Sequence, residues 1–327
     1  MHIAAKLARF GAFWILPVWA FGAGGSCWLR DGAAPAPSTA YLLCEQGTLW
    51  TTVDSGKTWT PRDMKAAEKV RAVSFLDAQH GLAVGDRGLL IATDDGGRTW
   101  QKRDSGTTNH LMDISFVGSS GWIAAFQGVV LHTSDGGKTW AAQKTGTTQT
   151  LESIYFADEK HGWAVGWAGT ILRTLDGGEK WEQVKVTAAT WSLTSVFFKD
   201  DKNGWIVGFA GQILRSKDGG ATWQPQTSSV RGWLTSIAFD AKGRGWITHD
   251  DGFLTSEDNG ETWKNVPAEG RYFLARLIRV NDALWAIGQS TVLRQVDNGK
   301  WQKIQELQLG ATAAAASAEA AGETTSK

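Results

Sequence analysis

The chain has 327 residues, and its 33 Lys plus Arg balance its 33 Asp plus Glu, so the formal net charge at neutral pH is zero. A balanced charge gives no overall field to attract nucleic acid or an anionic lipid surface, and we expect no nucleic-acid partner. The composition is unusual in its 19 Trp and 39 Gly beside only 6 Pro.

The N-terminus has the composition of an export signal. Lys6 and Arg9 precede an apolar stretch over residues 10–23, and small residues follow at 22–26. A basic start, an apolar segment and small residues are typical of secretory signals, and the segment is shorter than the roughly 20 residues of a membrane span. We expect residues 1–26 to be a signal peptide or an uncleaved anchor. The protein would then be exported to the periplasm or held on the outer side of the inner membrane.

Two cysteines follow this segment. Cys27, after Gly25 and Ser26, resembles a lipoprotein processing site, although Gly24 stands where Leu is usual. Lipid anchoring through Cys27 is therefore an alternative to a cleaved signal. Two cysteines do not make a disulfide framework, and we interpret Cys44 as a small buried thiol. Residues 27–39, with their Ala-Pro-Ala-Pro run, are predicted to form a linker.

An eight-residue pattern, [ST]-x-D-x-G-x-T-W, recurs along the rest of the sequence. Its closing tryptophans fall at positions 59, 100, 140, 181, 223, 263 and 301, at intervals of 38–42 residues. Seven units at a near-constant period indicate a repeat architecture. Asp can bond its own backbone and Gly accepts a positive φ, so each copy predicts a hairpin turn. The turn-forming aspartates are Asp54, Asp95, Asp135, Asp176, Asp218, Asp258 and Asp297.

This pattern resembles the Asp-box, also called the bacterial neuraminidase repeat. In the families that carry it, the box is a structural hairpin at the rim of a β-propeller blade, remote from any catalytic centre. The resemblance implies a structural role for these aspartates. Calcium binding is the alternative, but each box offers too few carboxylates to hold the ion alone. We expect no metal and no cofactor.

Between boxes, each unit repeats three short apolar runs, such as 154–156, 162–165 and 171–173, and the box Trp opens a fourth. Four short strands per unit predict an all-β fold, a seven-bladed β-propeller of four-stranded antiparallel blades with Asp-box hairpins, over residues 40–309. A run of the first type precedes only six of the seven boxes. Residues 304–309 are therefore predicted to complete the first blade. The Ala/Glu/Thr-rich segment 310–327 has no core-forming pattern and is predicted to be disordered.

Asp-boxes also occur in sialidases, so catalysis is considered. A sialidase needs an arginine cluster, a Tyr nucleophile beside a Glu, and an acid/base Asp. The sequence has 3 Tyr, and Tyr155 lies in the middle of a predicted strand. Its 6 His are scattered without metal-ligand spacing. We expect no enzyme activity, and keep a sialidase-like glycoside hydrolase as the less favoured alternative.

Residues 162–178 closely match the unit x-G-W-x-V-G-x-x-G-x-I-L-x-T-x-D-G-G. In this respect the protein resembles the photosystem II assembly and stability factor family, over about residues 41–301. The resemblance implies a non-catalytic protein that binds assembling membrane-protein subunits. We therefore expect an exported, monomeric propeller that scaffolds or assists assembly of a membrane or envelope protein complex.

Loops on one predicted face carry residues that the fold does not require. Alternate connections of a four-stranded blade share a face, and here the second-to-third and blade-to-blade loops carry aromatic and arginine residues. This is the composition of an interaction surface. The alternative is that the aromatic rings fold inward and plug the propeller axis. Aromatic platforms also bind sugars, so a carbohydrate-binding module is the alternative function. The predicted partner-binding residues are Arg87, Phe126, Trp167, Trp191, Phe209, Arg231, Trp233, Arg271 and Tyr272.

Overall fold

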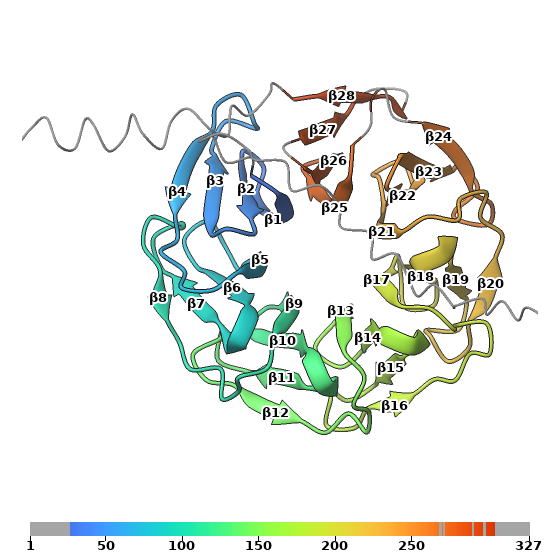
Figure 1. Cartoon of the computed structure of the whole chain (residues 1–327), viewed down its shortest axis with the longest axis horizontal. Coiled ribbons are helices and arrows are strands. Elements are labelled where there is room, and N and C mark those ends of the chain that lie inside the picture. Colours follow the sequence, from blue (N-terminus) through green and yellow to red (C-terminus); the bar gives the residue numbers. More distant parts are fainter. Residues whose placement is uncertain (1–26, 268–269, 271, 290, 297–298, 305–327) are drawn as a thin grey trace, which may run out of the picture.

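The computed structural model describes residues 27–304 except 268–269, 271, 290 and 297–298, and these residues form a β-propeller of seven four-stranded antiparallel sheets (Figure 1). Each sheet is one blade of four consecutive strands, so the predicted fold class is confirmed. The first four blades are built from β1 (Leu29–Ala36), β2 (Thr39–Cys44), β3 (Thr48–Thr52), β4 (Thr60–Asp63); β5 (Val70–Phe75), β6 (Gly81–Gly85), β7 (Leu90–Thr93), β8 (Gln101–Lys102); β9 (Leu111–Val117), β10 (Ser120–Ala125), β11 (Val130–Thr133), β12 (Ala141–Gln143); and β13 (Leu151–Phe156), β14 (Gly162–Gly166), β15 (Ile171–Thr174), β16 (Glu182–Gln183). The last three are built from β17 (Leu193–Phe198), β18 (Gly204–Gly208), β19 (Ile213–Ser216), β20 (Gln224–Gln226); β21 (Leu234–Phe239), β22 (Gly245–His249), β23 (Gly252–Ser256), β24 (Lys264–Pro267); and β25 (Leu274–Val280), β26 (Ala283–Gly288), β27 (Thr291–Gln295), β28 (Trp301–Lys303).

The first strand of every blade lies next to the propeller axis (Figure 1). Successive first strands contact one another from β1 through β5, β9, β13, β17 and β21 to β25, and β25 contacts β1. The propeller therefore closes on itself. Four short 3-10 turns connect the second and third strands of blades 2 to 5, namely η1 (Asp86–Gly88), η2 (Phe126–Gly128), η3 (Trp167–Gly169) and η4 (Phe209–Gly211). Within the described residues, no helix is long and apolar enough to cross a membrane.

The innermost strand of the first blade differs from the sequence prediction. It is β1, formed by residues whose composition predicts a linker, and it pairs antiparallel with β2. Its alanines and Pro35 lack the β-branched pattern of the other first strands. This composition can still form the strand, because an innermost strand pairs with a neighbour on one side only. Pro is tolerated there because its missing N–H need not serve a ladder, and the register shifts between Ala33 and Ala36. The prediction that residues 304–309 complete the blade is wrong: Ile304 follows β28, and its N–H donates to the carbonyl of Val292 at 2.9 Å.

The two cysteines also differ from the sequence prediction. Cys27 and Cys44 form a disulfide with a Cα–Cα distance of 5.5 Å, so Cys44 is not a free thiol. The pairing follows from β1, which brings residue 27 back beside the end of β2. The sulfur that lipid attachment to Cys27 would need is occupied by this bond.

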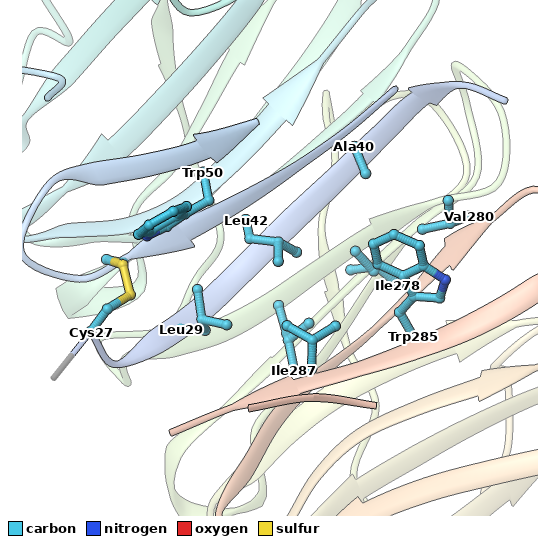
Figure 2. Close-up of a cluster of buried hydrophobic side chains, with 11 residues drawn as sticks. Cys27, Leu29, Ala40, Leu42, Trp50, Ile278, Val280, Trp285 and Ile287 are labelled. Carbon is cyan, nitrogen blue, oxygen red and sulfur yellow. A yellow bond between two sulfur atoms is a disulfide. The ribbon is translucent and has the colours of Figure 1, made fainter. Parts of the chain in front are cut away.

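The disulfide sits at one end of an apolar cluster that joins the first and last blades (Figure 2). Leu29 and Leu42 of blade 1 meet Ile287 and Trp285 of blade 7, and all four are at most 1% exposed. No strand is shared between the two blades, so the burial of apolar side chains stabilises this junction. An isolated bridge between Trp28 and Gln289 adds a backbone link.

The second strand of a blade carries a tryptophan that joins neighbouring blades. Trp163 is 1% exposed, stacks on Phe198 of the next blade with ring centroids 3.6 Å apart, and donates from Nε1 to the carbonyl oxygen of Gly219 at 3.2 Å. The equivalent nitrogens of Trp122 and Trp205 donate to box glycines of their next blades. The high Trp content is thus largely part of the propeller architecture.

Six of the seven Asp-boxes lie within the described residues, and their aspartates hold the third-to-fourth strand turn. In the box of blade 3, Asp135 Oδ1 accepts from the Thr133 hydroxyl at 2.7 Å and from the Thr139 backbone N–H at 3.0 Å, while Oδ2 accepts from the Thr139 hydroxyl at 2.6 Å. Hydrogen bonds to the ionised form stabilise it, so the pKa values of these carboxyls fall. Bonds from Thr58 hold the pKa of Asp54 at about 2, and bonds from Thr99 hold the pKa of Asp95 at about 2. Asp297 lies outside the described residues.

These lowered pKa values predict how stability depends on pH. The folded-state pKa lies below the unfolded value of about 3.9, so the contribution is present above pH 4 and is lost as pH falls towards 2. We expect the melting temperature to fall steeply between pH 4 and pH 2, as measured by circular dichroism. An Asp54→Asn, Asp95→Asn double variant should melt lower at pH 7 and show a shallower acid slope. An unchanged slope in that variant would contradict a stabilising role of the ionised boxes.

The predictions for the two termini lie outside the described residues. These are the signal or anchor at 1–26 and the disordered tail at 310–327.

Candidate partner-binding face

The loops that carry the predicted binding residues lie together on one face of the propeller. Backbone hydrogen bonds join second-to-third turns to neighbouring blade-to-blade loops: Phe126 N–H donates to the carbonyl of His110 at 2.9 Å, and Gly169 N–H donates to that of Trp191 at 3.0 Å. Gly211 N–H donates in the same way to Gly232, at 2.8 Å. The turns require a left-handed residue, with Ala168 at φ 52° followed by Gly169 at φ 67°. This conformation presents the residue before it, Trp167, at the surface.

The aromatic side chains of this face form two runs of neighbouring rings, which we call the aromatic arc. In the first run, Phe126 lies 5.9 Å from Trp167. The second run joins Trp191 to Phe209 at 5.6 Å, Phe209 to Trp233 at 6.1 Å, Trp233 to Phe273 at 6.3 Å and Phe273 to Trp28 at 5.8 Å, all between ring centroids. The arc therefore consists of Phe126, Trp167, Trp191, Phe209, Trp233, Phe273 and Trp28.

Most rings of the arc are open to solvent. Trp167 is 46% exposed, Trp191 52%, Phe209 42%, Trp233 45% and Trp28 41%. These five do not fold inward to plug the axis. Phe126 and Phe273 are partly buried beneath their neighbours. Side chains of this size are seldom exposed as a contiguous group without a binding role.

The arginine and tyrosine residues predicted for this face differ in their exposure and in their contacts. Arg87 and Arg231 are exposed, and Arg87 forms an ion pair with Glu68. Tyr272 is partly buried and packs against the apolar cluster between blades 6 and 7, so its ring is not a free surface group. Arg271 lies outside the described residues.

Charged side chains beneath the arc are tied to partners. Trp167 Nε1 donates to Glu152 Oε1 at 2.6 Å. Asp86 pairs with Arg71, and its Oδ1 lies 2.9 Å from His110 Nδ1. Burial opposes ionisation of Asp86, but the bonds from Arg71 and His110 outweigh it and lower the pKa. Among the described residues, no group of three or more His, Cys, Asp and Glu side chains is placed to hold a metal ion.

Sequence reasoning missed Trp28 and Phe273. Both stand directly before the first strand of a blade and are followed by Leu, as is Trp233. An aromatic–Leu pair at the start of three adjacent blades is the signal that could have identified them. Trp28 is hard to find in this way because its segment has the composition of a linker.

The family comparison gives a match to the family described as photosynthesis system II assembly factor YCF48, at residues 63–147, 140–226 and 180–273. The chain belongs to this family. Together the three matched regions extend over more than half of the sequence and cover the blades that carry most of the aromatic arc. No curated protein matches the protein in sequence.

Solved structures with similar folds include two of the same family. One, described as YCF48 bound to D1 peptide, has 23% identity and a TM-score of 0.62, and the match covers 75% of this chain and 84% of that one. The second, YCF48 from Cyanidioschyzon merolae, has 23% identity and a TM-score of 0.56 over 72% of this chain and 84% of that one. An ancestral GH74 enzyme has 12% identity and a TM-score of 0.68 over 86% of this chain and 46% of that one. Identities this low show a shared propeller fold.

Proposed function

We propose that this propeller is a non-catalytic binding protein that engages a subunit of a membrane or envelope protein complex through the aromatic arc and assists its assembly. The observation that carries the proposal is the set of exposed, adjoining rings on one face of a protein of this family. Large aromatic side chains at low entropic cost are the usual energetic centres of protein interfaces. The solved family member described as bound to a D1 peptide supports a peptide segment as the contacting part.

The tyrosines support the absence of catalysis. The Tyr41 hydroxyl donates to the carbonyl of Ala78 at 3.1 Å, and the Tyr155 hydroxyl donates to that of Phe198 at 3.0 Å. Tyr155 also packs among the rings of Phe197 and Phe198. Among the described residues, neither hydroxyl has a hydrogen bond to a glutamate, which a sialidase nucleophile would need beside it. The likeness to a GH74 enzyme concerns the fold.

The disulfide supports export. Disulfides persist in oxidising compartments such as the periplasm and are rare in the cytosol. Cys27 directly follows the segment 1–26, whose composition is that of a secretory signal. A periplasmic location would place the arc where it can reach membrane-protein loops.

The arc can be tested by affinity purification from solubilised membranes. We expect a Trp167→Ala, Trp233→Ala double variant to recover at least tenfold less of a defined membrane-protein complex than wild type, because truncating interface aromatics commonly costs about 2 kcal/mol each. Its melting temperature should change little, since both rings are about half exposed. A matched control is Leu175→Ala in an Asp-box, which removes an apolar side chain of similar exposure, 49%, from the opposite face.

Equal recovery by the double variant and wild type would contradict the proposal. If only Leu175→Ala reduced recovery of the complex, the contact would lie on the opposite face. Binding on a glycan array without any recovered protein would instead support a carbohydrate-binding module.

A further inference from the structure

The aromatic arc borders a cavity at the propeller axis. The cavity has a volume of about 340 Å³ and is lined by the first residues of the innermost strands, so it opens on the same face as the blade-to-blade loops. Trp28, Phe273 and Trp233 form one wall, and Met112 and Ala275 add further apolar surface. The cavity thus lies beside the run of rings from blades 6, 7 and 1.

An ion cluster with two buried carboxylates borders this cavity. Arg276 of β25 reaches Asp31 of β1 and Asp113 of β9, at 3.2 Å to each carboxylate. Asp31 also accepts from the Val73 N–H at 2.9 Å, and Asp113 accepts from the Ile154 N–H at 3.0 Å. The pull of Asp113 raises the pKa of Arg276 although burial opposes it. The two carboxylates thus share one guanidinium and are each also held by a backbone N–H.

The other acidic and basic side chains of the lining each have a hydrogen-bond or ion-pair partner, with one exception. Arg71 is bound by Asp86, Glu45 pairs with Lys69 at 3.3 Å, and Glu152 accepts from Trp167. Arg30 lines the cavity and is partly buried, yet its guanidinium forms no hydrogen bond or ion pair with any residue that the structure describes.

An unpaired guanidinium in a partly enclosed cavity is costly. Arg keeps its charge in proteins and presents five donors in a planar fork that matches a carboxylate. Burial and the neighbouring charge of Arg71 lower the pKa of Arg30, while Glu45 and Glu152 oppose this from a distance without contacting it. An anion that reached Arg30 would replace the hydrogen bonds to water lost on burial and would offset the repulsion from Arg71.

We propose that the axial cavity binds a carboxylate of the partner on Arg30, with an adjacent apolar side chain against the wall formed by Trp28, Phe273 and Trp233. A carboxylate with a single charge fits better than a more highly charged anion, because Glu45 and Glu152 also line the cavity and would repel additional negative charge. The carboxylate comes from the C-terminus of the partner polypeptide or from one of its Asp or Glu residues. This inference rests on the proposed function, because it names what the arc recognises.

Three fluorescein-labelled peptides test it against the full-length protein by fluorescence anisotropy. One ends in Ala-Leu-Phe with a free carboxylate, the second has the same sequence with a C-terminal amide, and the third is amidated but carries Glu next to Phe. We expect the free carboxylate peptide to bind about tenfold more tightly than its amide, as one charge-assisted bidentate pair would give. Tight binding of the third peptide would assign the site to acidic side chains as well; weak binding would assign it to C-termini.

Variants make the test specific. Arg30→Gln should abolish the difference between carboxylate and amide, and Arg30→Lys should retain part of it. Arg98→Gln, which removes an exposed arginine from the Asp-box of blade 2, should leave the difference unchanged. Equal binding of carboxylate and amide, no binding of any peptide at millimolar concentration, or an unchanged difference in Arg30→Gln would overturn the inference.

The membrane purification described above separates this failure from failure of the proposed function. Recovery that depends on Trp167 and Trp233, in a protein without carboxylate preference, would leave the arc as an interface and remove only the Arg30 site.

Discussion

Replacement of Trp163 by alanine is expected to lower the free energy of unfolding by about 3–5 kcal/mol, the usual cost of truncating a buried Trp. The indole is almost fully buried and stacks on Phe198, and its Nε1 donates to Gly219 of the next blade. The substitution would leave a cavity between blades 4 and 5 and an unpaired carbonyl in a box turn. Denaturant unfolding, with the midpoint and slope both recorded, measures the loss.

Two controls test whether the loss comes from the buried position of Trp163. Trp163→Phe keeps an aromatic ring and loses the Nε1 donor, so it should cost clearly less than Trp163→Ala. Trp167→Ala, on the exposed arc four residues later, should cost no more than about 0.5 kcal/mol. Equal losses for Trp163→Ala and Trp167→Ala would mean that the blade-joining role assigned to Trp163 is wrong.

Arg276→Met is expected to destabilise the protein by about 3–5 kcal/mol at pH 7, because removing one member of a buried ion cluster leaves the others uncompensated. The carboxylates left behind are 6% exposed at Asp31 and 2% at Asp113. Thermal and denaturant unfolding of the variant give the loss. Adding Asp31→Asn and Asp113→Asn to Arg276→Met should recover much of the stability.

The pH dependence of Arg276→Met gives a second readout. Burial already raises the pKa of Asp31 in the intact cluster, and losing the cation removes the main opposing influence. A carboxyl with a raised folded pKa favours folding when protonated, and this advantage is lost as pH rises through that pKa. The stability gap between variant and wild type should therefore narrow from pH 7 towards pH 5. A constant gap would indicate that lost packing, not unpaired charge, causes the destabilisation.

Features encoded within one repeat were predictable from sequence, because they depend on local chemistry. The Asp-box turns follow from hydrogen bonds between residues two to four positions apart, such as those of Asp135 with Thr133 and Thr139. The shared place of Phe126, Trp167 and Phe209 on adjacent blades follows from the repeat spacing. Repetition thus located the face and three of the seven rings of the aromatic arc.

Features at the closure of the propeller were not predictable in the same way. The strand β1 has the composition of a linker, since an innermost strand tolerates Pro35 and small alanines. The disulfide depends on that strand, so it was missed with it. Arg276 and Asp113 are 163 positions apart, and only the closed ring of blades brings them together across the axis. Arg30 could not be identified as a binding residue from sequence, because only the folded structure shows that the charged side chains around it have partners.

Site-specific photo-crosslinking tests the central claim most directly, namely that the aromatic arc contacts a membrane-protein partner. Phe209 is 42% exposed on the arc and would be replaced by p-benzoylphenylalanine, with Leu175, 49% exposed on the box face, replaced in a second variant. After irradiation of intact cells, mass spectrometry identifies the crosslinked proteins. We predict a defined membrane-protein adduct from position 209 and none from position 175. An adduct from position 175 with none from position 209 would contradict the assignment of the binding face.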